Sequence, residues 1–247
     1  MQKLGVGIIA AIMLGLAVFL LGKMNDMKRE NAETEAICET GEDVSLNAAQ
    51  EMQAEGLCIV IDAGHGGIDC GKVSESGILE KDINLQMAFL LRSALEEAGF
   101  TVVMTRESDA GLYDEDAPNK KVQDLQRRVA LIEESGAVMV ISLHQNSYPD
   151  ASVRGGQVFY FEESAEGECL ASCIQNRIRQ DVDPENHREI KGDGDYFLLQ
   201  QTETVTVIVE CGFLSNPQEA ELLSREEYQM QMTEAIVAGI MDYLAEE

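Results

Sequence analysis

The chain has 247 residues, enough for one sizeable folded domain with an appended segment, and an apolar content of 45% supports a packed core. It carries 45 acidic and 18 basic residues, which gives a formal net charge of −27. Because phosphate binding needs clustered lysines and arginines, this charge argues against nucleic acids and against polybasic contacts with lipid.

The first 24 residues are predicted to form a membrane segment. Residues 5–22, GVGIIAAIMLGLAVFLLG, are apolar and uncharged, with Lys3 before them and Lys23 after them. At about 1.5 Å per residue this run spans most of a hydrocarbon core. No A-x-A-like cleavage site follows, so we expect an uncleaved transmembrane anchor over residues 1–24, with a cleaved signal segment as the alternative. The basic residues after the run weakly favour retention of the C-terminal part inside the cell.

Residues 25–56 are polar and acidic and show no sustained apolar period. Such a composition is typical of a linker or a loosely helical stalk. The folded domain is therefore predicted to cover residues 57–247.

Short apolar runs alternate with helical patterns along this domain. Strands are predicted at 57–64, 101–106, 137–144, 155–161 and 204–212, and helices at 81–100, 123–136, 166–182 and 219–247. Continuous apolar strands alternating with helices are typical of a buried, largely parallel sheet. We predict a single α/β domain with a twisted, mostly parallel sheet flanked by helices, whose ligands bind beyond the carboxyl ends of the strands.

Two of the three histidines lie at predicted strand ends. His65 is in the glycine-rich loop DAGHGG, and His144 ends the run AVMVISLH. Two such histidines favour a ligand pair, and catalytic zinc usually takes three protein ligands. His187 lies in a stretch typical of an exposed loop, so the third ligand is expected to be a carboxylate. Glu80 at the start of a helix is one candidate, although a glutamate in a first turn also stabilises the helix dipole.

Glu210 ends the apolar run of residues 205–209, where a carboxylate would normally be excluded. At that depth it must be paired, bind a metal or transfer protons. A glutamate beside a zinc-bound water can take its proton and pass it to a leaving amine. The residues therefore indicate a water-activating hydrolase that lacks the HExxH motif.

Two other interpretations use part of this pattern. DAGHGGIDCG could cradle a phosphate, but it lacks the Lys-Ser/Thr of a P-loop and the spacing GxGxxG. A cysteine hydrolase would use Cys211 as nucleophile and His144 as base. Of the six cysteines, Cys169 and Cys173 are one helical turn apart, as in a buried stripe, and the absence of a CxxC pair argues against a cysteine zinc site.

Five segments together resemble a known family. In chain order they are IDAGHGGID, LEKDINL, MTR, ISLHQNS and VIVECGFLSNPQEAELL. They are similar to the motifs of zinc-dependent N-acetylmuramoyl-L-alanine amidases of the amidase-3 type. VECGFLSNP and IKGDGDYFLL resemble most the germination-specific, sporulation-associated branch, although the second stretch is one residue longer than the branch's pattern. The resemblance covers about residues 57–245.

The resemblance implies a zinc site and a set of roles. By position, the zinc ligands fall on His65, Glu80 and His144, and the catalytic glutamate falls on Glu210. Arg106 and Arg128 match recurrent arginines, for which a structural role is expected. Asp62 is expected either to support the zinc ligands or to form the turn.

The resemblance also implies the reaction and its setting. Members of this family cut the amide bond between the lactyl group of muramic acid and L-alanine of the stem peptide. Peptidoglycan lies outside the membrane, so the domain is expected to be extracytoplasmic, either membrane-anchored or secreted to the cell wall, despite the weak charge signal. A partner lipoprotein is a further expectation from the sporulation branch. A non-catalytic wall-binding protein is the remaining alternative.

Overall fold

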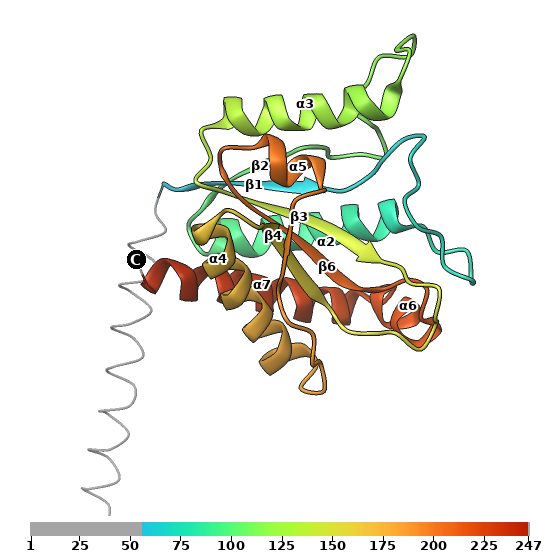
Figure 1. Ribbon diagram of the computed structural model, residues 1–247, viewed down its shortest axis with the longest axis vertical. Coiled ribbons are helices and arrows are strands. Elements are labelled where there is room, and N and C mark those ends of the chain that lie inside the picture. Colours follow the sequence, from blue (N-terminus) through green and yellow to red (C-terminus); the bar gives the residue numbers. More distant parts are fainter. Residues whose placement is uncertain (1–55, 247) are drawn as a thin grey trace, which may run out of the picture. The chain divides into compact units, whose positions relative to one another are not determined.

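The computed structural model describes residues 56–246 (Figure 1). The predicted membrane segment, residues 1–24, lies outside them, as does nearly all of the predicted linker. No helix within residues 56–246 combines the length and apolar character needed to cross a membrane.

Six strands form one mixed sheet in the order β2-β1-β3-β6-β4-β5. Their bounds are β1 Cys58–Ala63, β2 Thr101–Met104, β3 Met139–Asn146, β4 Gln157–Phe161, β5 Lys191–Asp193 and β6 Val205–Phe213. All neighbouring pairs are parallel except β4 and β6, which are antiparallel. The predicted α/β domain is thus confirmed, and the five predicted strands coincide with all of the observed ones except the short β5.

Helices cover both faces of the sheet (Figure 1). Their bounds are α2 Glu80–Glu97, α3 Lys120–Ser135, α4 Ala165–Arg177, α5 Phe197–Gln201, α6 Pro217–Leu223 and α7 Glu226–Glu246, and a π-helical turn, η1 Ile178–Val182, follows α4. The larger core lies between the sheet and α2, α4 and α7, whereas a smaller core lies under α3 and α5. The predicted closing segment 219–247 is therefore two helices, α6 and α7.

Strand β1 shows why the central strands have continuous apolar sequences. Ile59 and Ile61 pack into the larger core, while Val60 between them packs into the smaller core. All three side chains are fully buried. A strand covered by helices on both faces has no solvent-facing side, so the usual alternation of polar and apolar residues disappears.

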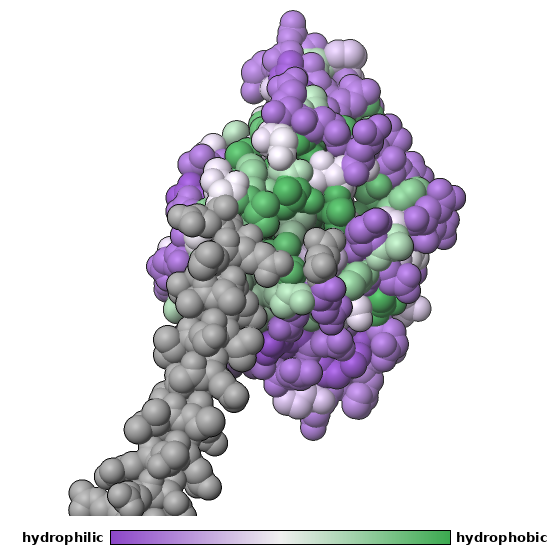
Figure 2. Space-filling model, turned by 90° about the vertical axis from the view of Figure 1, so that its left-hand side faces the viewer, coloured by the Kyte–Doolittle hydropathy of each residue, from purple (hydrophilic) through white to green (hydrophobic). Residues whose placement is uncertain are grey.

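The register of the parallel strands brings their carboxyl ends together. Ala63 at the end of β1 pairs with Leu143 of β3, and His144 pairs with Glu210 of β6. The opposite edge, where β1 and β3 begin, carries hydrophobic residues near the centre of a mostly hydrophilic face (Figure 2). The polar residues at the carboxyl ends of β1, β3 and β6 therefore lie together at the other edge of the sheet.

Candidate active site

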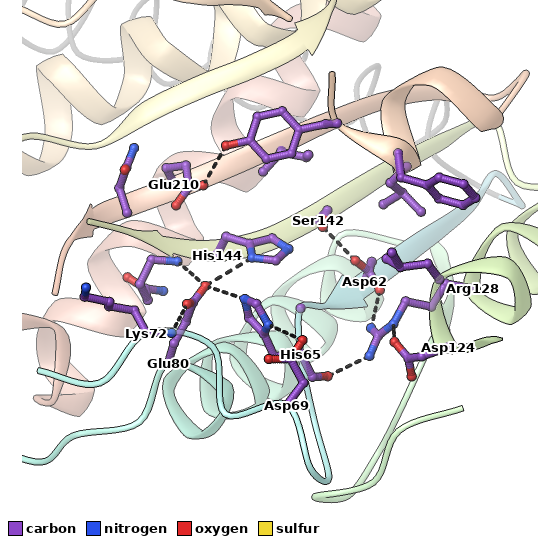
Figure 3. A pocket seen from close by; sticks show the side chains of 18 of the residues that line it. Asp62, His65, Asp69, Lys72, Glu80, Asp124, Arg128, Ser142, His144 and Glu210 are labelled. Carbon is purple, nitrogen blue, oxygen red and sulfur yellow. Dashed lines mark hydrogen bonds and ion pairs between the residues drawn. The ribbon is translucent and has the colours of Figure 1, made fainter. Parts of the chain in front are cut away.

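A cleft of about 380 Å³ opens at the carboxyl edge of β1, β3 and β6. His65, Glu80, His144 and Glu210, the four residues predicted from the sequence, all line it (Figure 3). They come from the loop after β1, the first turn of α2, the end of β3 and the end of β6. The structure therefore brings together residues that are far apart in the chain.

His65 has an unusual backbone conformation. Its φ of 64° lies in the left-handed region, and no other non-glycine residue among 56–246 has a positive φ. This conformation costs an L-residue roughly 1–2 kcal/mol and persists only where the surroundings enforce it. Here Arg128 Nη2 donates to the His65 carbonyl at 2.6 Å. The imidazole Nδ1 lies 3.1 Å from Asp69 Oδ2, which leaves Nε2 directed at Glu80.

Glu80 connects the two histidines. Its Oε1 lies 3.0 Å from His65 Nε2 and 3.1 Å from His144 Nδ1. The backbone N–H of Gln145 donates to Oε1 at 3.0 Å, and that of Lys72 donates to Oε2 at 2.6 Å. Burial alone would raise the pKa of Glu80, but the hydrogen bonds and positive charge of the two histidines lower that pKa well below its usual range. Glu80 is therefore a carboxylate that two backbone amides hold in place.

His144 packs directly against the glycine-rich loop. A Cβ atom at Gly64 would lie 2.3 Å from His144 Cε1, so no side chain fits at this position. Asn84 Nδ2 donates to the Gly64 carbonyl at 3.1 Å and fixes the loop on α2. The two imidazoles meet edge to face with ring centroids 4.9 Å apart. Glycine at position 64 therefore makes room for the second histidine.

The three side chains fit a metal ion. One ligand atom each from His65, Glu80 and His144 lies within 4.8 Å of the other two. Two imidazoles with one carboxylate are a usual protein ligand set for catalytic zinc, which keeps a further position for water. These three residues could therefore hold a metal ion at the cleft.

Glu210 lies beside this cluster and differs from Glu80 in its surroundings. Its side chain is 6% exposed, and Tyr196 donates to Oε1 at 3.4 Å. Oε2 is buried and has no hydrogen-bond partner among residues 56–246. Burial raises the pKa of Glu210 to about 7, with a further increase from Glu80 that His144 and Tyr196 partly offset. A carboxyl with such a pKa can accept and return a proton near neutral pH.

A buried ion pair between Asp62 and Arg128 lies at the cleft and stabilises its wall. Asp62 accepts hydrogen bonds from Arg128 Nη1 at 2.6 Å, Ser142 Oγ at 2.7 Å and Thr105 Oγ1 at 2.8 Å. Burial would raise the pKa of Asp62, but Arg128 and Ser142 lower it to about 2. Since Arg128 also binds the His65 carbonyl, Asp62 acts on the site through this arginine.

Arg106 also binds the glycine-rich loop that follows β1. Its Nε donates to the Ala63 carbonyl at 2.8 Å, and its Nη2 donates to the carbonyls of Gly64 at 3.1 Å and Lys81 at 2.8 Å. These contacts join the glycine-rich loop to the start of α2. The structural role expected for Arg106 and Arg128 agrees with this geometry.

Sequence reasoning missed Asp69 and Tyr196. Asp69 carried a signal, because it follows His65 by four residues within the same loop. Tyr196 carried none, because its contact with Glu210 depends on how the segment between β5 and α5 folds over the cleft. The backbone amides that hold Glu80 are equally invisible in a sequence.

The other two candidate residues, Cys211 and His187, do not line the cleft. Cys211 is fully buried in the larger core, where burial raises its thiol pKa strongly, so it is poorly suited to act as a nucleophile. His187 is in an exposed loop, as predicted, and does not line the cleft.

An open α/β sheet that carries two histidines, a shared carboxylate and a second carboxylate in one cleft is an arrangement suited to hydrolysis by an activated water. Residues 59–242 match the family described as N-acetylmuramoyl-L-alanine amidase. The chain belongs to this family and is an enzyme that hydrolyses peptidoglycan, which confirms the predicted class.

Individual relatives agree with this assignment. The chain is 40% identical over 198 residues to the germination-specific N-acetylmuramoyl-L-alanine amidase of Bacillus subtilis (strain 168), a match that covers 79% of this chain and 83% of the relative. The structure of the CwlD amidase from Clostridioides difficile in complex with the GerS lipoprotein matches with 38% identity and a TM-score of 0.75, over 77% of this chain and 100% of that one. An N-acetylmuramoyl-L-alanine amidase structure from Clostridium difficile 630 matches with 30% identity and a TM-score of 0.69, over 78% and 99%.

Proposed function

We propose that the protein is a zinc-dependent amidase that cuts the bond between the lactyl group of N-acetylmuramic acid and L-alanine of the stem peptide. The observation that carries the proposal is the convergence of His65, Glu80, His144 and Glu210 in one cleft. The first three residues would hold the zinc ion. When bound there, zinc lowers the pKa of a coordinated water and polarises the scissile carbonyl.

Glu210 would move the proton. As a carboxylate it takes one proton from the attacking water while the water oxygen bonds to the scissile carbonyl carbon. It then returns this proton to the alanine nitrogen as the carbon–nitrogen bond breaks, which yields a lactyl carboxylic acid and a free amine; the acid then loses its proton, and at neutral pH the products are a carboxylate and an ammonium group. The unpartnered Oε2 and the raised pKa of Glu210 both suit this role.

The relatives support a proposal for the setting of the enzyme. A germination-specific amidase and an amidase bound to a lipoprotein are both among them. We place this enzyme outside the cytoplasm, in remodelling of the cell wall or spore cortex, with a lipoprotein as partner. Residues 1–24 would attach it to the membrane or direct its export, and residues 25–56 would serve as the stalk.

Metal removal tests the proposal. Purified peptidoglycan is incubated with the enzyme before chelation, after chelation and after zinc is restored, and newly exposed alanine amino groups are counted. We expect chelation to abolish release and zinc to restore it. His65→Ala should reduce the rate by about 100-fold or more, while His187→Ala in the exposed loop should leave it unchanged. Full activity of the chelated enzyme would contradict the proposal.

A further inference from the structure

Two thiols and a carboxylate meet at a place remote from the cleft. Cys169 and Cys173 lie one turn apart on α4, and Glu246 lies in the last turn of α7. One ligand atom from each lies within 4.8 Å of the other two, and Cys169 Sγ is 3.5 Å from Glu246 Oε2. In Figure 1 the start of α4 is beside the end of α7. None of the three residues lines the catalytic cleft.

The surrounding packing fixes this arrangement without help from an ion. A Cβ atom at Gly239 of α7 would lie 2.6 Å from Ile174 Cα of α4, so the two helices touch backbone to backbone. One turn along each helix, Arg177 Nε and Nη2 bind the two carboxylate oxygens of Asp242 at 2.5 and 2.7 Å. The helices are therefore held together next to the cysteines, which positions the donor atoms in advance and reduces the entropy lost on binding an ion.

The chemistry of the three donors favours a cation. Cys173 is only 7% exposed, whereas Glu246 lies at an exposed helix end. Packing alone would explain two cysteines in a helix interface, because cysteine behaves as a small apolar residue. The Cys169 thiol donates a hydrogen bond to Glu246, but packing and this one bond do not require three potential ligand atoms to lie within 4.8 Å of one another. A divalent cation would displace the thiol protons and balance the charge of all three groups.

We propose that Cys169, Cys173 and Glu246 form a second cation site, for a thiophilic divalent ion of the zinc class, that joins α4 to the end of α7. Two thiolates and one carboxylate are suitable ligands for such an ion, with water completing its coordination. The site was hidden from sequence patterns, because its cysteines are four residues apart and its third donor comes from the other end of the domain. Its role would be structural, as it fastens the last helix of the fold.

Cobalt binding to the full chain tests the site. The histidine site is first removed with the double variant His65→Ala/His144→Ala, and the cysteines are kept reduced. On titration with Co²⁺ we expect a thiolate-to-metal charge-transfer band that saturates at one ion per chain. Cys169→Ser and Cys173→Ser, each added to the double variant, should abolish the band. Cys58→Ser, in a strand away from this site, should leave it unchanged.

Two measurements keep the test independent of folding defects. Glu246→Gln, at an exposed helix end, should retain the fold while it weakens cobalt binding by at least about tenfold. Zn²⁺ should raise the melting temperature of the double variant and should not raise it after Cys169→Ser. Absence of the band at saturating Co²⁺, or its persistence in both serine variants, would overturn the second site. Because all of these measurements are made in a chain without the histidine site, they do not depend on the proposed reaction.

Discussion

Glu80 and Glu210 show how one cleft gives two glutamates different roles. Glu80 sits between two imidazoles and two backbone amides, which hold it ionised. Glu210 has one tyrosine hydroxyl and a buried, unpartnered oxygen, and its pKa is raised to about 7. Environments that separate the pKa values of neighbouring acids support the proposed roles, metal binding for Glu80 and proton transfer for Glu210.

Asp69 provides a test of how the first histidine is oriented. Its Oδ2 contacts His65 Nδ1 at 3.1 Å, which leaves Nε2 for the metal. Because such outer carboxylates fix the ligand ring, Asp69→Asn should weaken zinc binding by about 10–100-fold. Chelator competition measures this affinity. The control is Asp150→Asn, in a distant exposed turn, and equal affinities for the two variants would contradict the role of Asp69.

A second prediction concerns the contribution of Asp62 to the stability of the fold. Asp62→Asn removes the more buried of the two carboxylates that pair with Arg128 and leaves Asp124 at 2.7 Å, so it should lower the free energy of unfolding at neutral pH by up to about 3 kcal/mol. Urea unfolding measures this change. Asp114→Asn, which breaks an exposed pair with Arg127, should have a much smaller effect.

The same carboxyl gives a pH dependence. The pKa of Asp62 is about 2 in the folded chain and near its ordinary, higher value in the unfolded chain. The stability that it contributes is therefore complete above about pH 4 and is lost as the pH falls towards about 2. Over this interval the stability difference between wild type and Asp62→Asn should shrink. A difference that stays constant down to pH 2 would show that the pair does not act as described.

At the scale of elements, the loop between β1 and α2 forms half of the site. Gly71, with a φ of +63°, lies so close to the site that a Cβ atom there would be 2.5 Å from Glu80 Oε2 and 2.6 Å from His65 Cδ2. Gly136 after α3 has a similar φ of +65° and open space around it. A comparison of substitutions at these two glycines separates the effect of the left-handed backbone from the effect of steric crowding.

Alanine at each of these glycines should destabilise the fold by about 1–2 kcal/mol, because both have left-handed backbones. Only Gly71→Ala should also lose zinc affinity and amidase activity, since the new methyl group displaces Glu80 and His65. Thermal unfolding and zinc titration of the pair provide the comparison. Comparable zinc affinity in the two variants would refute the crowding argument.

Strands and helices differ in how far the sequence reveals them. The buried strands were predictable, because burial on both faces leaves continuous apolar runs such as that of β6. Strand β5 and helix α5 were not, since three and five residues are too short for a pattern and the residues of β5 are polar. The four site residues were found because each follows an apolar run or opens a helix. The contacts of Asp69 and Tyr196 depend on tertiary folding that no local pattern encodes.

At the scale of the whole molecule, one domain holds both the core and the cleft, since the sheet and the four candidate site residues all lie within residues 57–246. We therefore predict that a fragment of residues 57–247 folds alone. Its melting temperature should lie within a few degrees of that of the full chain, and its kcat on soluble muropeptides should be the same. Loss of kcat in a folded fragment would show that the preceding segment takes part in catalysis.

The central claim is that Glu210 transfers the proton at a metal site built by His65, Glu80 and His144. The most direct test is the kcat of Glu210→Gln on muropeptides at saturating zinc, because this change keeps the shape of the side chain and removes its basicity. The account predicts a loss of about 100–10,000-fold with zinc still bound by the three ligands. A kcat equal to that of the wild-type enzyme would contradict it.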